Sequence, residues 1–388
     1  MALPLSYNFR NVFVRWKSSV LAILGIALVV TVFVTLSGMS SGFRHALRST
    51  GRTDNAIVYQ KGSASELTSS ISKEQENFVT VDSRIQRDAN GKPLASPEMV
   101  VVANLLHRKD RTPTNVTIRG VTPAAFEVRG GITIKEGRRL TFGLQEVIVG
   151  QRIAERIEGL DLNSTFKLQK LDWKVAGIFA SDGSGFESEI WMDSKVLSQA
   201  FNRRDMAQSI TLRLTDPSVL REIATELEAD PKVQVELKQE RQYYEEQAGP
   251  IANAILALAG FVSIVMGIGA IFGGMNTMYA IVSQRTREIG TLRALGFSQG
   301  SILFSFMVES VLLALIGGVA GCVLATFSNG FSAATGGPGF SEVAFAFRIT
   351  PEIYGYGLGF AAFMGLLGGL LPAIRAAGVP IAAALKDS

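Results

Sequence analysis

The sequence has one cysteine and two histidines, so disulfide frameworks and zinc sites lack their usual residues. Cys322 has no partner for an intrachain disulfide and lies in an apolar stretch, where we interpret it as a small packing residue. Zinc sites take three or four ligands from cysteine, histidine and carboxylate side chains, and no cysteine–histidine cluster occurs here. We therefore expect neither a structural disulfide nor a bound metal.

Charged residues are also scarce, at 19% of the chain, where a soluble protein has about 25%. Long uncharged runs cover 18–43, 247–284, 310–341 and 353–374. A helix needs about 20 apolar residues to cross roughly 30 Å of hydrocarbon. The sequence therefore predicts four transmembrane helices, at 19–41, 251–282, 300–327 and 353–377. The first run is too long for a cleaved signal peptide and no A-x-A-like site follows it, so a retained anchor is expected.

Lysine and arginine predict the orientation of these helices. The segment from Arg44 to Glu246 has 29 basic and 29 acidic residues and is therefore neutral. An excess of Lys and Arg marks cytoplasmic segments. Apart from Arg348, the remaining basic residues are Arg10, Arg15 and Lys17, then Arg285, Arg287 and Arg293, then Arg375 and Lys386. We therefore expect both termini and the loop 283–299 in the cytoplasm, and residues 42–250 outside.

The segment 56–246 mixes strand and helix patterns and predicts an α+β domain. The runs "NAIVYQKG", "FVTVDSRI", "EMVVVANLL" and "NVTIRGVT" are rich in β-branched residues and are expected to be strands. "SITLRLT", "DPSVLREIATELEAD" and "KVQVELK" predict strand, helix and strand, with Pro217 near the helix start. The residues between these halves predict a second, more β-rich subdomain inserted in the first.

Sites for hydrolysis and nucleotide binding are missing from the sequence. The loop Ser181–Gly185 has hydroxyls and a carboxylate but no nearby histidine, and a G-x-S-x-G elbow is absent. Asp182, Glu187 and Glu189 could in principle gather a cation, but a flexible surface loop rich in Gly and Ser is the favoured interpretation and needs no cation. The pattern G-x-x-x-x-G-K-[ST] is also absent, because the Gly91-Lys92 pair is followed by proline. We expect no catalysis by this chain and no cofactor bound to it.

Polar stretches flank the outer ends of the first two predicted spans. "QERQYYEEQAGP" predicts a helical extension of the second span, broken or bent at Gly249–Pro250, and "SSGFRHALRST" follows the first span. These extensions are interpreted either as a paired stalk or as ordinary solvated linkers, and the sequence does not decide between them.

The stretch "SQRTREIGTLRALGFSQGSILF" (283–304) places three arginines and a glutamate between two apolar runs. As a helix it has Ile289, Leu292 and Gly296 on one stripe below Arg285, with Arg287 on the opposite side. It is either an interfacial helix held by anionic lipid or a docking element for a cytoplasmic protein. Gly290 favours docking, because glycine allows close approach, and Gly296 can end the helix.

The pattern "VSQRTREIGTLRALGFSQGSILFSFMVESVLLALIGGVAG" (282–321) resembles the FtsX-like permease family, which includes MacB-type, LolC/LolE-type and DevC-type ABC transporter subunits. "NFRNVFVRWKSSVLAILGIALVV" resembles the family's elbow and first span. "GVTPAAFEVRGGITIKEGRRLTFGLQEVIVGQRIAERI" with "ESEIWMD" resembles the MacB-type periplasmic core domain, and "LLPAIRAAGVPIAAALK" resembles the family's C-terminal end. MacB itself carries a fused ATPase ahead of the first span, which is not present in this sequence.

The resemblance implies a type VII (mechanotransmission) ABC permease without a fused ATPase, in a bacterial inner membrane. The expected segments are an elbow at 1–18, spans at 19–41, 251–282, 300–327 and 353–377, an extracytoplasmic domain with stalk at 42–250, a coupling helix at 283–299, an extracytoplasmic loop at 328–352 and a tail at 378–388. By position, the family's coupling residues correspond to Arg285, Thr286, Arg287, Glu288, Ile289, Gly290, Leu292, Arg293, Ala294, Leu295 and Gly296.

Glu309 is an ionisable residue inside a predicted span, where a charge costs about 2–3 kcal/mol unless it is paired. It matches a glutamate of the family, and we expect it to bond a neighbouring helix or an arginine of the coupling helix.

The resemblance also implies partners. These are a cytoplasmic ABC ATPase carrying ATP and Mg, a second permease copy or paralogue, membrane lipid and, in some members, a periplasmic adaptor (membrane fusion protein). The expected function is export of a hydrophobic substrate such as a lipid, lipoprotein, peptide or drug. The alternative is an FtsX-like mechanical regulator of a periplasmic cell-wall hydrolase.

Overall fold

A computed structural model describes residues 16–203, 206–230, 233–337 and 340–381. Residues 1–15 of the predicted elbow (1–18), with Arg10 and Arg15, and residues 382–388 of the predicted tail (378–388), with Lys386, lie outside these residues. The chain divides into two compact units. The helix unit takes in residues 1–42, 251–331 and 347–388, and the outer unit takes in residues 43–250 and 332–346.

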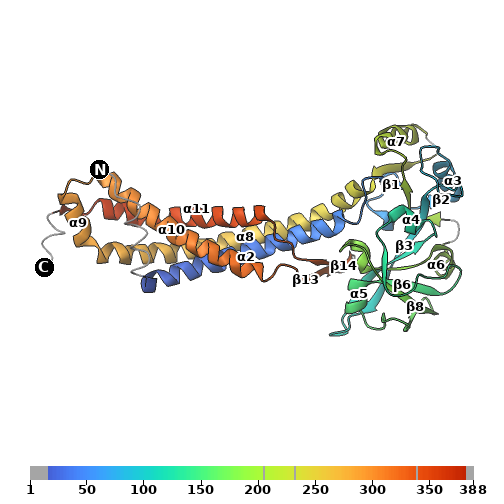
Figure 1. Cartoon of the computed structure of the whole chain (residues 1–388), viewed down its shortest axis with the longest axis horizontal. Helices are drawn as coiled ribbons and strands as arrows, with labels where there is room; N and C mark the ends of the chain where they lie inside the picture. The colour runs from blue at the N-terminus through green and yellow to red at the C-terminus, as the bar shows by residue number, and fades with distance from the viewer. Residues whose placement is uncertain (1–15, 204–205, 231–232, 338–339, 382–388) are drawn as a thin grey trace. The chain divides into compact units, whose positions relative to one another are not determined.

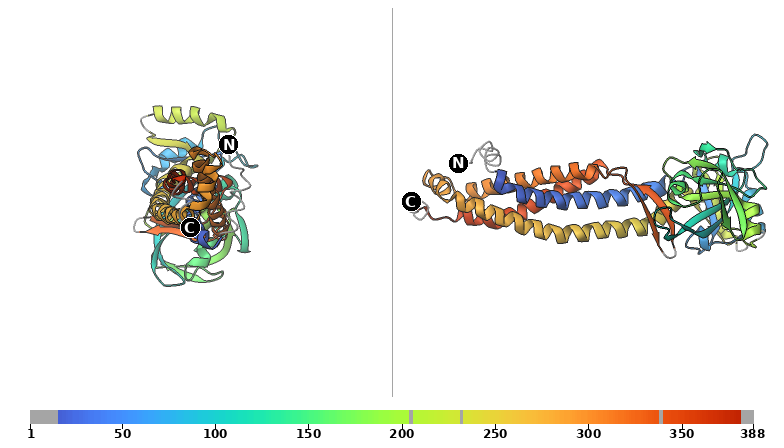
Figure 2. Two further views of the ribbon diagram at one scale, coloured as in Figure 1. Left: turned by 90° about the vertical axis from the view of Figure 1, so that its left-hand side faces the viewer. Right: turned by 90° about the horizontal axis from the view of Figure 1, so that it is seen from below.

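Within the described residues, four helices are long and apolar enough to cross a membrane. They lie side by side in the helix unit (Figures 1 and 2). Their bounds are α2 (Trp16–Arg48), α8 (Glu240–Gln284), α10 (Gln299–Thr326) and α11 (Pro351–Ala377), and the short α9 (Thr286–Ala294) follows α8. α8 continues through Gly249 and Pro250, so the predicted break is wrong. The carbonyl that Pro250 leaves without a donor belongs to the exposed Glu246, where water can satisfy it.

Small residues allow α10 to approach α2 and α11 closely. A Cβ on Gly318 would lie 2.7 Å from the Cβ of Ala361, and one on Gly321 would lie 2.8 Å from the Cβ of Val30. Both distances are shorter than real side chains tolerate, so a larger residue would push the helices apart. The hydroxyl of Ser310 on α10 also donates to the carbonyl of Gly365 on α11. Close backbone approach and interhelical hydrogen bonds are the usual source of cohesion between membrane helices.

The outer unit is built on one ten-stranded sheet with the order β12-β1-β11-β3-β4-β9-β6-β8-β5, and β7 pairs with β8. The strands are β1 (Asn55–Gln60), β3 (Ala95–Leu106), β4 (Pro113–Val121), β5 (Thr133–Gly137), β6 (Glu146–Gly150), β7 (Thr165–Leu168), β8 (Leu171–Ala180), β9 (Glu189–Asp193), β11 (Ser209–Arg213) and β12 (Val235–Gln239). Two further pairs join β2 (Ile71–Ser72) to β10 (Met206–Ala207), and β13 (Ser332–Gly337) to β14 (Phe340–Ala346).

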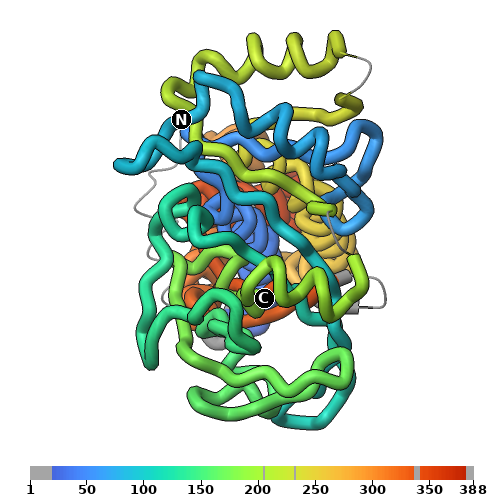
Figure 3. Tube along the Cα trace, turned by 90° about the vertical axis from the view of Figure 1, so that its right-hand side faces the viewer, coloured from blue at the N-terminus to red at the C-terminus, as the bar shows by residue number. Residues whose placement is uncertain are grey.

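Short helices complete this unit (Figure 3). The α-helices are α3 (Lys73–Thr80), α4 (Ala125–Arg129), α5 (Gln151–Arg156), α6 (Ser194–Ala200) and α7 (Leu220–Ala229), and the 3-10 helices are η1 (Glu66–Thr68), η2 (Gly185–Ser188) and η3 (Pro217–Val219).

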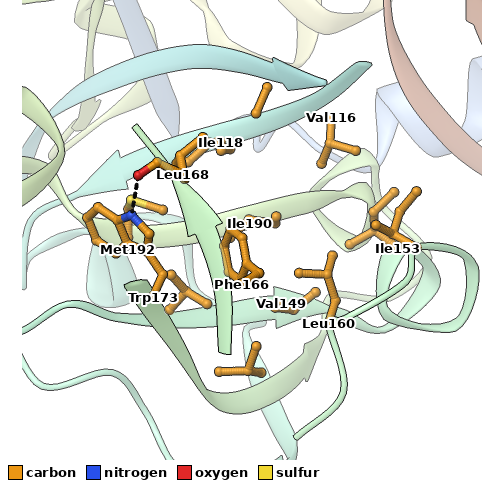
Figure 4. Close-up of a cluster of buried hydrophobic side chains, with 14 of the residues drawn as sticks. Val116, Ile118, Val149, Ile153, Leu160, Phe166, Leu168, Trp173, Ile190 and Met192 are labelled. Carbon is orange, nitrogen blue, oxygen red and sulfur yellow. Dashed lines mark hydrogen bonds between the residues drawn. The ribbon is translucent and has the colours of Figure 1, made fainter. Parts of the chain in front are cut away.

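One cluster of buried apolar side chains contains residues from both halves of the sheet, among them Ile57 of β1, Ile148 of β6 and Trp191 of β9. Two further clusters each belong to one half and define two lobes. One core packs α3 and α7 against β1, β11 and β12. The other lies among β3 to β9, where the indole of Trp173 donates to the carbonyl of Leu168 at 3.2 Å (Figure 4). The second lobe is inserted between β1 and β11; an insertion was predicted, but β3 and β4, which the sequence analysis assigned to the first subdomain, contribute to the core of the second. The predicted fold class, four membrane-type helices with an α+β domain between the first two, is therefore confirmed.

Residues 73–80 form α3, so the predicted strand "FVTVDSRI" is wrong. The helix begins with a capping box in which the hydroxyl of Ser72 accepts from the backbone of Gln75 and the amide of Gln75 accepts from the backbone of Ser72. Such a box satisfies two N–H groups that a helix start otherwise leaves unpaired. The cap therefore outweighs the strand preference of Phe78, Val79 and Val81.

Candidate functional site

The residues after α8 fold into a short helix with defined ends. The hydroxyl of Thr286 donates to the carbonyl of Ser283 at 2.9 Å as α9 begins. Gly296 has φ +95°, a left-handed conformation that favours glycine and follows the helix end, as the sequence predicted. The hydroxyl of Ser298 then accepts from the backbone of Ser301 and starts α10. The helix α9 is therefore shorter than the predicted 283–299, because Ser283 and Gln284 still belong to α8 and Gln299 already begins α10.

One face of α9 is packed against the ends of the long helices. Ile289 is 1% exposed and lies in a cluster with Met278, Ile302 and Phe306. Gly290 is buried as well, and Leu292 is half-buried. α9 is therefore held by contacts with α8 and α10, and its position depends on theirs.

An ion pair connects the start of α9 to the interior of α10. The guanidinium of Arg285 lies 2.7 Å from the carboxylate of Glu309, and both side chains are about 95% buried, at 4% and 5% exposure. Arg285 also donates to Glu288 at 2.9 Å and lies 5.0 Å from the ring centroid of Phe306. Glu309 thus bonds an arginine beside α9, which is the contact expected from the sequence.

A second arginine connects α9 to the end of α11. Arg293 donates to the carbonyl of Ala377 at 3.0 Å and to that of Val379 at 3.2 Å. The last carbonyls of a helix have no intrahelical donor and carry its partial negative charge, so a guanidinium there is favourable. Together with the Glu309 contact, this attaches α9 to three of the long helices: α8, α10 and α11.

The opposite face of α9 is open to solvent. Arg287, Thr291, Ala294 and Leu295 are exposed at helical spacing, and Leu295 has 70% of its surface accessible. Thr286 and Glu288 lie at the edge between the two faces. The open side of α9 thus presents a basic side chain, Arg287, near its start and an apolar one, Leu295, just past its end. All eleven predicted coupling residues therefore lie on or directly beside α9.

The outer unit contains a buried ion network that the sequence did not reveal. Arg119 contacts Glu66, Glu98 and Glu189 at 2.8 to 3.0 Å. Arg129 contacts Glu98 and Glu240, each at 2.5 Å. The six residues of this network come from η1, β3, β4, α4, β9 and α8, and all are buried.

Glu240 is the first residue of α8 and one end of this network. Burial raises the pKa of its carboxyl, against the attraction of Arg129. Burial also acts to raise the pKa of Glu66, but the interactions with Arg119, Arg129 and Ser209 together outweigh it and leave that pKa below its ordinary value. Tyr243 of α8 adds a further contact, because its hydroxyl accepts from the backbone of Glu66 at 2.8 Å. The start of α8 is therefore fixed in the sheet by charged and polar contacts.

Two of the three carboxylates considered as a cation site, Glu187 and Glu189, have other partners. Glu187 lies 3.0 Å from Arg152 and accepts from the backbone of Ser181 and Gly183, while Glu189 binds Arg119. No group of three or more metal-ligating side chains occurs in the part of the chain that the structure describes. The Gly–Ser loop is thus organised by hydrogen bonds from its own backbone.

The predicted loop 328–352 contains the hairpin β13–β14, which belongs to the outer unit. Its Glu342 is 2% exposed and contacts Thr114 at 2.8 Å, His107 at 3.0 Å and Arg156 at 2.6 Å. The carbonyl of Ala344 accepts from Arg152 at 2.9 Å. The segment joining α10 to α11 is therefore bonded into the second lobe, and the only charged residue of β13 and β14 makes most of these contacts.

Comparison with known proteins identifies the family. Residues 19–230 match the MacB-like periplasmic core domain, and residues 260–381 match the FtsX-like permease C-terminal domain. Two Bacillus subtilis ABC transporter permeases match over nearly their whole length. YknZ is 25% identical over 391 positions, with 92% of each chain covered, and YvrN is 27% identical over 408, with 95% of each covered.

The macrolide export ATP-binding/permease protein MacB of Burkholderia thailandensis is 26% identical over 336 positions, covering 79% of this chain and 49% of MacB. The resemblance predicted from the sequence pattern is confirmed. The chain belongs to the family of ABC transporter permeases that combine a MacB-like periplasmic core with an FtsX-like permease domain, and it is a multi-pass membrane protein with an extracytoplasmic domain.

Proposed function

We propose that this permease transmits the ATP-driven motion of a separate cytoplasmic ATPase to its outer domain, and that this motion exports a hydrophobic substrate. The observation that carries the proposal is α9, a rigidly seated helix with an exposed apolar and basic face. ABC permeases act with an ATP-binding partner, and the two Bacillus relatives that match over their whole length are permeases.

The seating of α9 supports its role as the coupling helix. Its buried face packs on α8 and α10, Arg285 is paired with Glu309, and Arg293 caps α11. A force applied to Leu295 or Arg287 would therefore act on three helices at once. An interfacial helix held only by lipid would not need a buried ion pair with a neighbouring span.

The two long helices α2 and α8 support transmission to the outer domain, because each belongs partly to the helix unit and partly to the outer unit. In the helix unit the hydroxyl of Ser40 on α2 donates to the carbonyl of Ala252 on α8 at 2.8 Å. In the outer unit Arg48 lies 2.7 Å from Glu245. The helical extensions are thus paired, which favours a stalk over a solvated linker.

The motion would be passed to the outer domain at two places, Glu240 of α8 and the hairpin β13–β14. Glu240 connects α8 to both lobes through Arg129, Glu98 and Arg119. The hairpin connects α10 and α11 to the second lobe through Glu342. Displacement of either would therefore move the sheet and not only a surface loop.

The remaining parts of the proposal concern assembly and cargo. Four helices are few for a transport pathway, so two permease copies, or one copy and a paralogue, are proposed to pair in a bacterial inner membrane with both termini cytoplasmic. MacB is named as a macrolide exporter, and its similarity supports a hydrophobic cargo. A periplasmic adaptor would receive that cargo.

The test is ATP hydrolysis by the cognate ATPase, co-purified with the permease in nanodiscs. Leu295→Asp and Arg287→Glu change only exposed residues of α9 and should abolish co-purification and stimulated hydrolysis, while expression stays normal. Ile289→Asp and Glu288→Arg should have the same effect. Gln299→Asp, at an exposed position outside α9, is the matched control. Coupling that survives all four changes would refute the proposal.

The same co-purified complex can be used to distinguish an exporter from a regulator of a cell-wall hydrolase. Release of a hydrophobic substrate that depends on ATP supports the exporter. If the complex instead activates a cell-wall hydrolase without moving cargo, the outer motion is regulatory.

A further inference from the structure

An apolar pocket lies in the first lobe of the outer unit, between α3 and α7. These two helices run beside each other at the edge of the unit (Figures 1 and 3). The pocket has a volume of about 680 Å³. Its floor consists of buried aliphatic side chains, namely Val79, Ile85, Leu212, Ile223 and Leu227. Pockets of 300–1,000 Å³ with such linings are typical of small-molecule sites.

Large apolar side chains are also exposed at the mouth of this pocket. Phe78 has 54% of its surface accessible and Val81 has 73%. Phe78 lies in the last turn of α3 and Val81 directly follows that helix. Both line the pocket and extend its apolar surface towards solvent. Burying them would be favourable by roughly 25 cal/mol for each Å² of apolar surface covered. An apolar ligand could therefore contact buried aliphatic side chains inside the pocket and exposed apolar side chains at its mouth.

The charges around the pocket are negative. Glu74, Asp82 and Glu226 are among its lining residues, whereas no lysine, arginine or histidine is. Arg84, which is not a lining residue, pairs with Asp82 at 2.6 Å and Glu226 at 2.5 Å and lies 3.6 Å from Glu222, so one guanidinium is shared among three carboxylates and Glu74 is a fourth. A negative potential at an apolar mouth attracts cations and repels anions.

Two other cavities in the outer unit have a different lining. One, of about 450 Å³, is bordered by His107, Lys109 and Arg156, and another by Arg108 and Lys135. Both are mixed in charge and mostly lack aliphatic walls. Neither of these two cavities combines an aliphatic floor with an acidic mouth.

We infer that this pocket binds a small lipophilic cation, with its apolar body on Ile223 and Leu227 and its positive charge facing Glu74 and Glu226. The volume suits a compact molecule better than a helix of a partner protein, which would need a longer groove. The negative mouth excludes fatty acids and anionic lipids. This inference does not depend on the proposed function, because the pocket includes no residue of α9 or of the buried ion network.

The experiment uses the full chain in nanodiscs, with tetraphenylphosphonium as the cation and the almost isosteric tetraphenylborate as the anion. The cysteine-free background is Cys322→Ser, and Asn77→Cys places one thiol on the pocket lining. Tetraphenylphosphonium should slow the reaction of this thiol with N-ethylmaleimide, and tetraphenylborate should not. A thiol introduced by Lys109→Cys, exposed on the other lobe, should be protected by neither.

Charge and shape are then tested separately. Exposed ion pairs are worth a few tenths to 1 kcal/mol, so Glu74→Gln and Glu226→Gln should each weaken protection about threefold. Glu228→Gln, on an exposed residue of α7 outside the lining, should leave it unchanged. Ile223→Trp should fill the pocket and abolish protection. If that variant fails to fold, Phe78→Ser, which alters no buried residue, should still weaken binding.

Three results would overturn the inference. They are the absence of protection at millimolar tetraphenylphosphonium, equal protection by tetraphenylborate, and equal effects of Glu228→Gln and Glu74→Gln. The second result would show that the pocket recognises hydrophobic shape only. None of these measurements involves ATP or the ATPase, so they are independent of the coupling assay.

Discussion

Separating Arg285 from Glu309 should destabilise the helix unit by about 3–5 kcal/mol, the usual cost of leaving one partner of a buried ion pair uncompensated. At an effective dielectric constant of 20, two unit charges about 4 Å apart attract by roughly 4 kcal/mol, and this pair has its nearest atoms 2.7 Å apart. Arg285→Met and Glu309→Leu should therefore each lower stability, measured by unfolding of the micellar protein in sodium dodecyl sulfate.

Removing both charges should cost much less than the two single changes added together. In Arg285→Met with Glu309→Leu no buried charge remains, and apolar replacements of buried pairs are often neutral. We expect a coupling energy of at least about 2 kcal/mol from the double-mutant cycle. Arg375→Met is the matched control, because this arginine is exposed, and it should change stability by no more than about 0.5 kcal/mol. Costs that simply add would refute the reasoning.

Three further predictions concern orientation and the outer unit. A thiol introduced by Arg287→Cys should react with a membrane-impermeant maleimide only after the membrane is opened, whereas Lys109→Cys should react in intact spheroplasts; the reverse pattern would contradict the proposed topology. Arg129→Met, which leaves Glu240 buried without its guanidinium and Glu98 with Arg119 alone, should cost about 3–5 kcal/mol in thermal unfolding, while Arg111→Met, in an exposed pair with Glu158, should cost no more than about 1 kcal/mol. Hydrogen bonds from Arg138 hold the pKa of Glu146 at about 2, below its usual 4.5; because the folded-state pKa is the lower one, the stability difference between wild type and Arg138→Ala should be complete above pH 4.5 and should vanish as the pH falls towards 2, as read from unfolding curves across that range.

The sequence predicted those features that depend on nearby residues. Uncharged runs of sufficient length located the four helices, and a periodicity of three to four placed Ile289 on the buried face of α9 and Arg287 on the open one. Glu309 was recognised because a carboxylate is costly in an apolar run, and its partner then had to be a nearby cation. Local chemistry also explains the error at α3, where the capping box at Ser72 was overlooked.

The buried network and the hairpin could not be predicted in this way. Arg119 lies 53 residues from Glu66, and Arg129 lies 111 residues from Glu240. No spacing rule connects such residues, since only the order of strands in the sheet brings them together. Glu342 looked like an ordinary charged loop residue because its partner Arg156 lies 186 residues away in the sequence and His107 lies farther still. Arg156 also does not stand out by its charge, because the segment from Arg44 to Glu246 has equal numbers of basic and acidic residues.

Buried ion pairs lie at both ends of α8, and stability alone does not explain them. The attraction within an ion pair taken out of water often does no more than offset the cost of removing the two charges from water. Well-packed apolar residues would therefore often stabilise the fold as well. What a short, directed pair supplies is position, because apolar surfaces can slide over each other whereas a guanidinium and a carboxylate lose their contact within about an ångström. α8 begins at Glu240 in the outer unit and ends beside Arg285 in the helix unit. If α8 transmits motion as proposed, Arg285→Met with Glu309→Leu should keep most of its stability and still lose stimulated ATP hydrolysis.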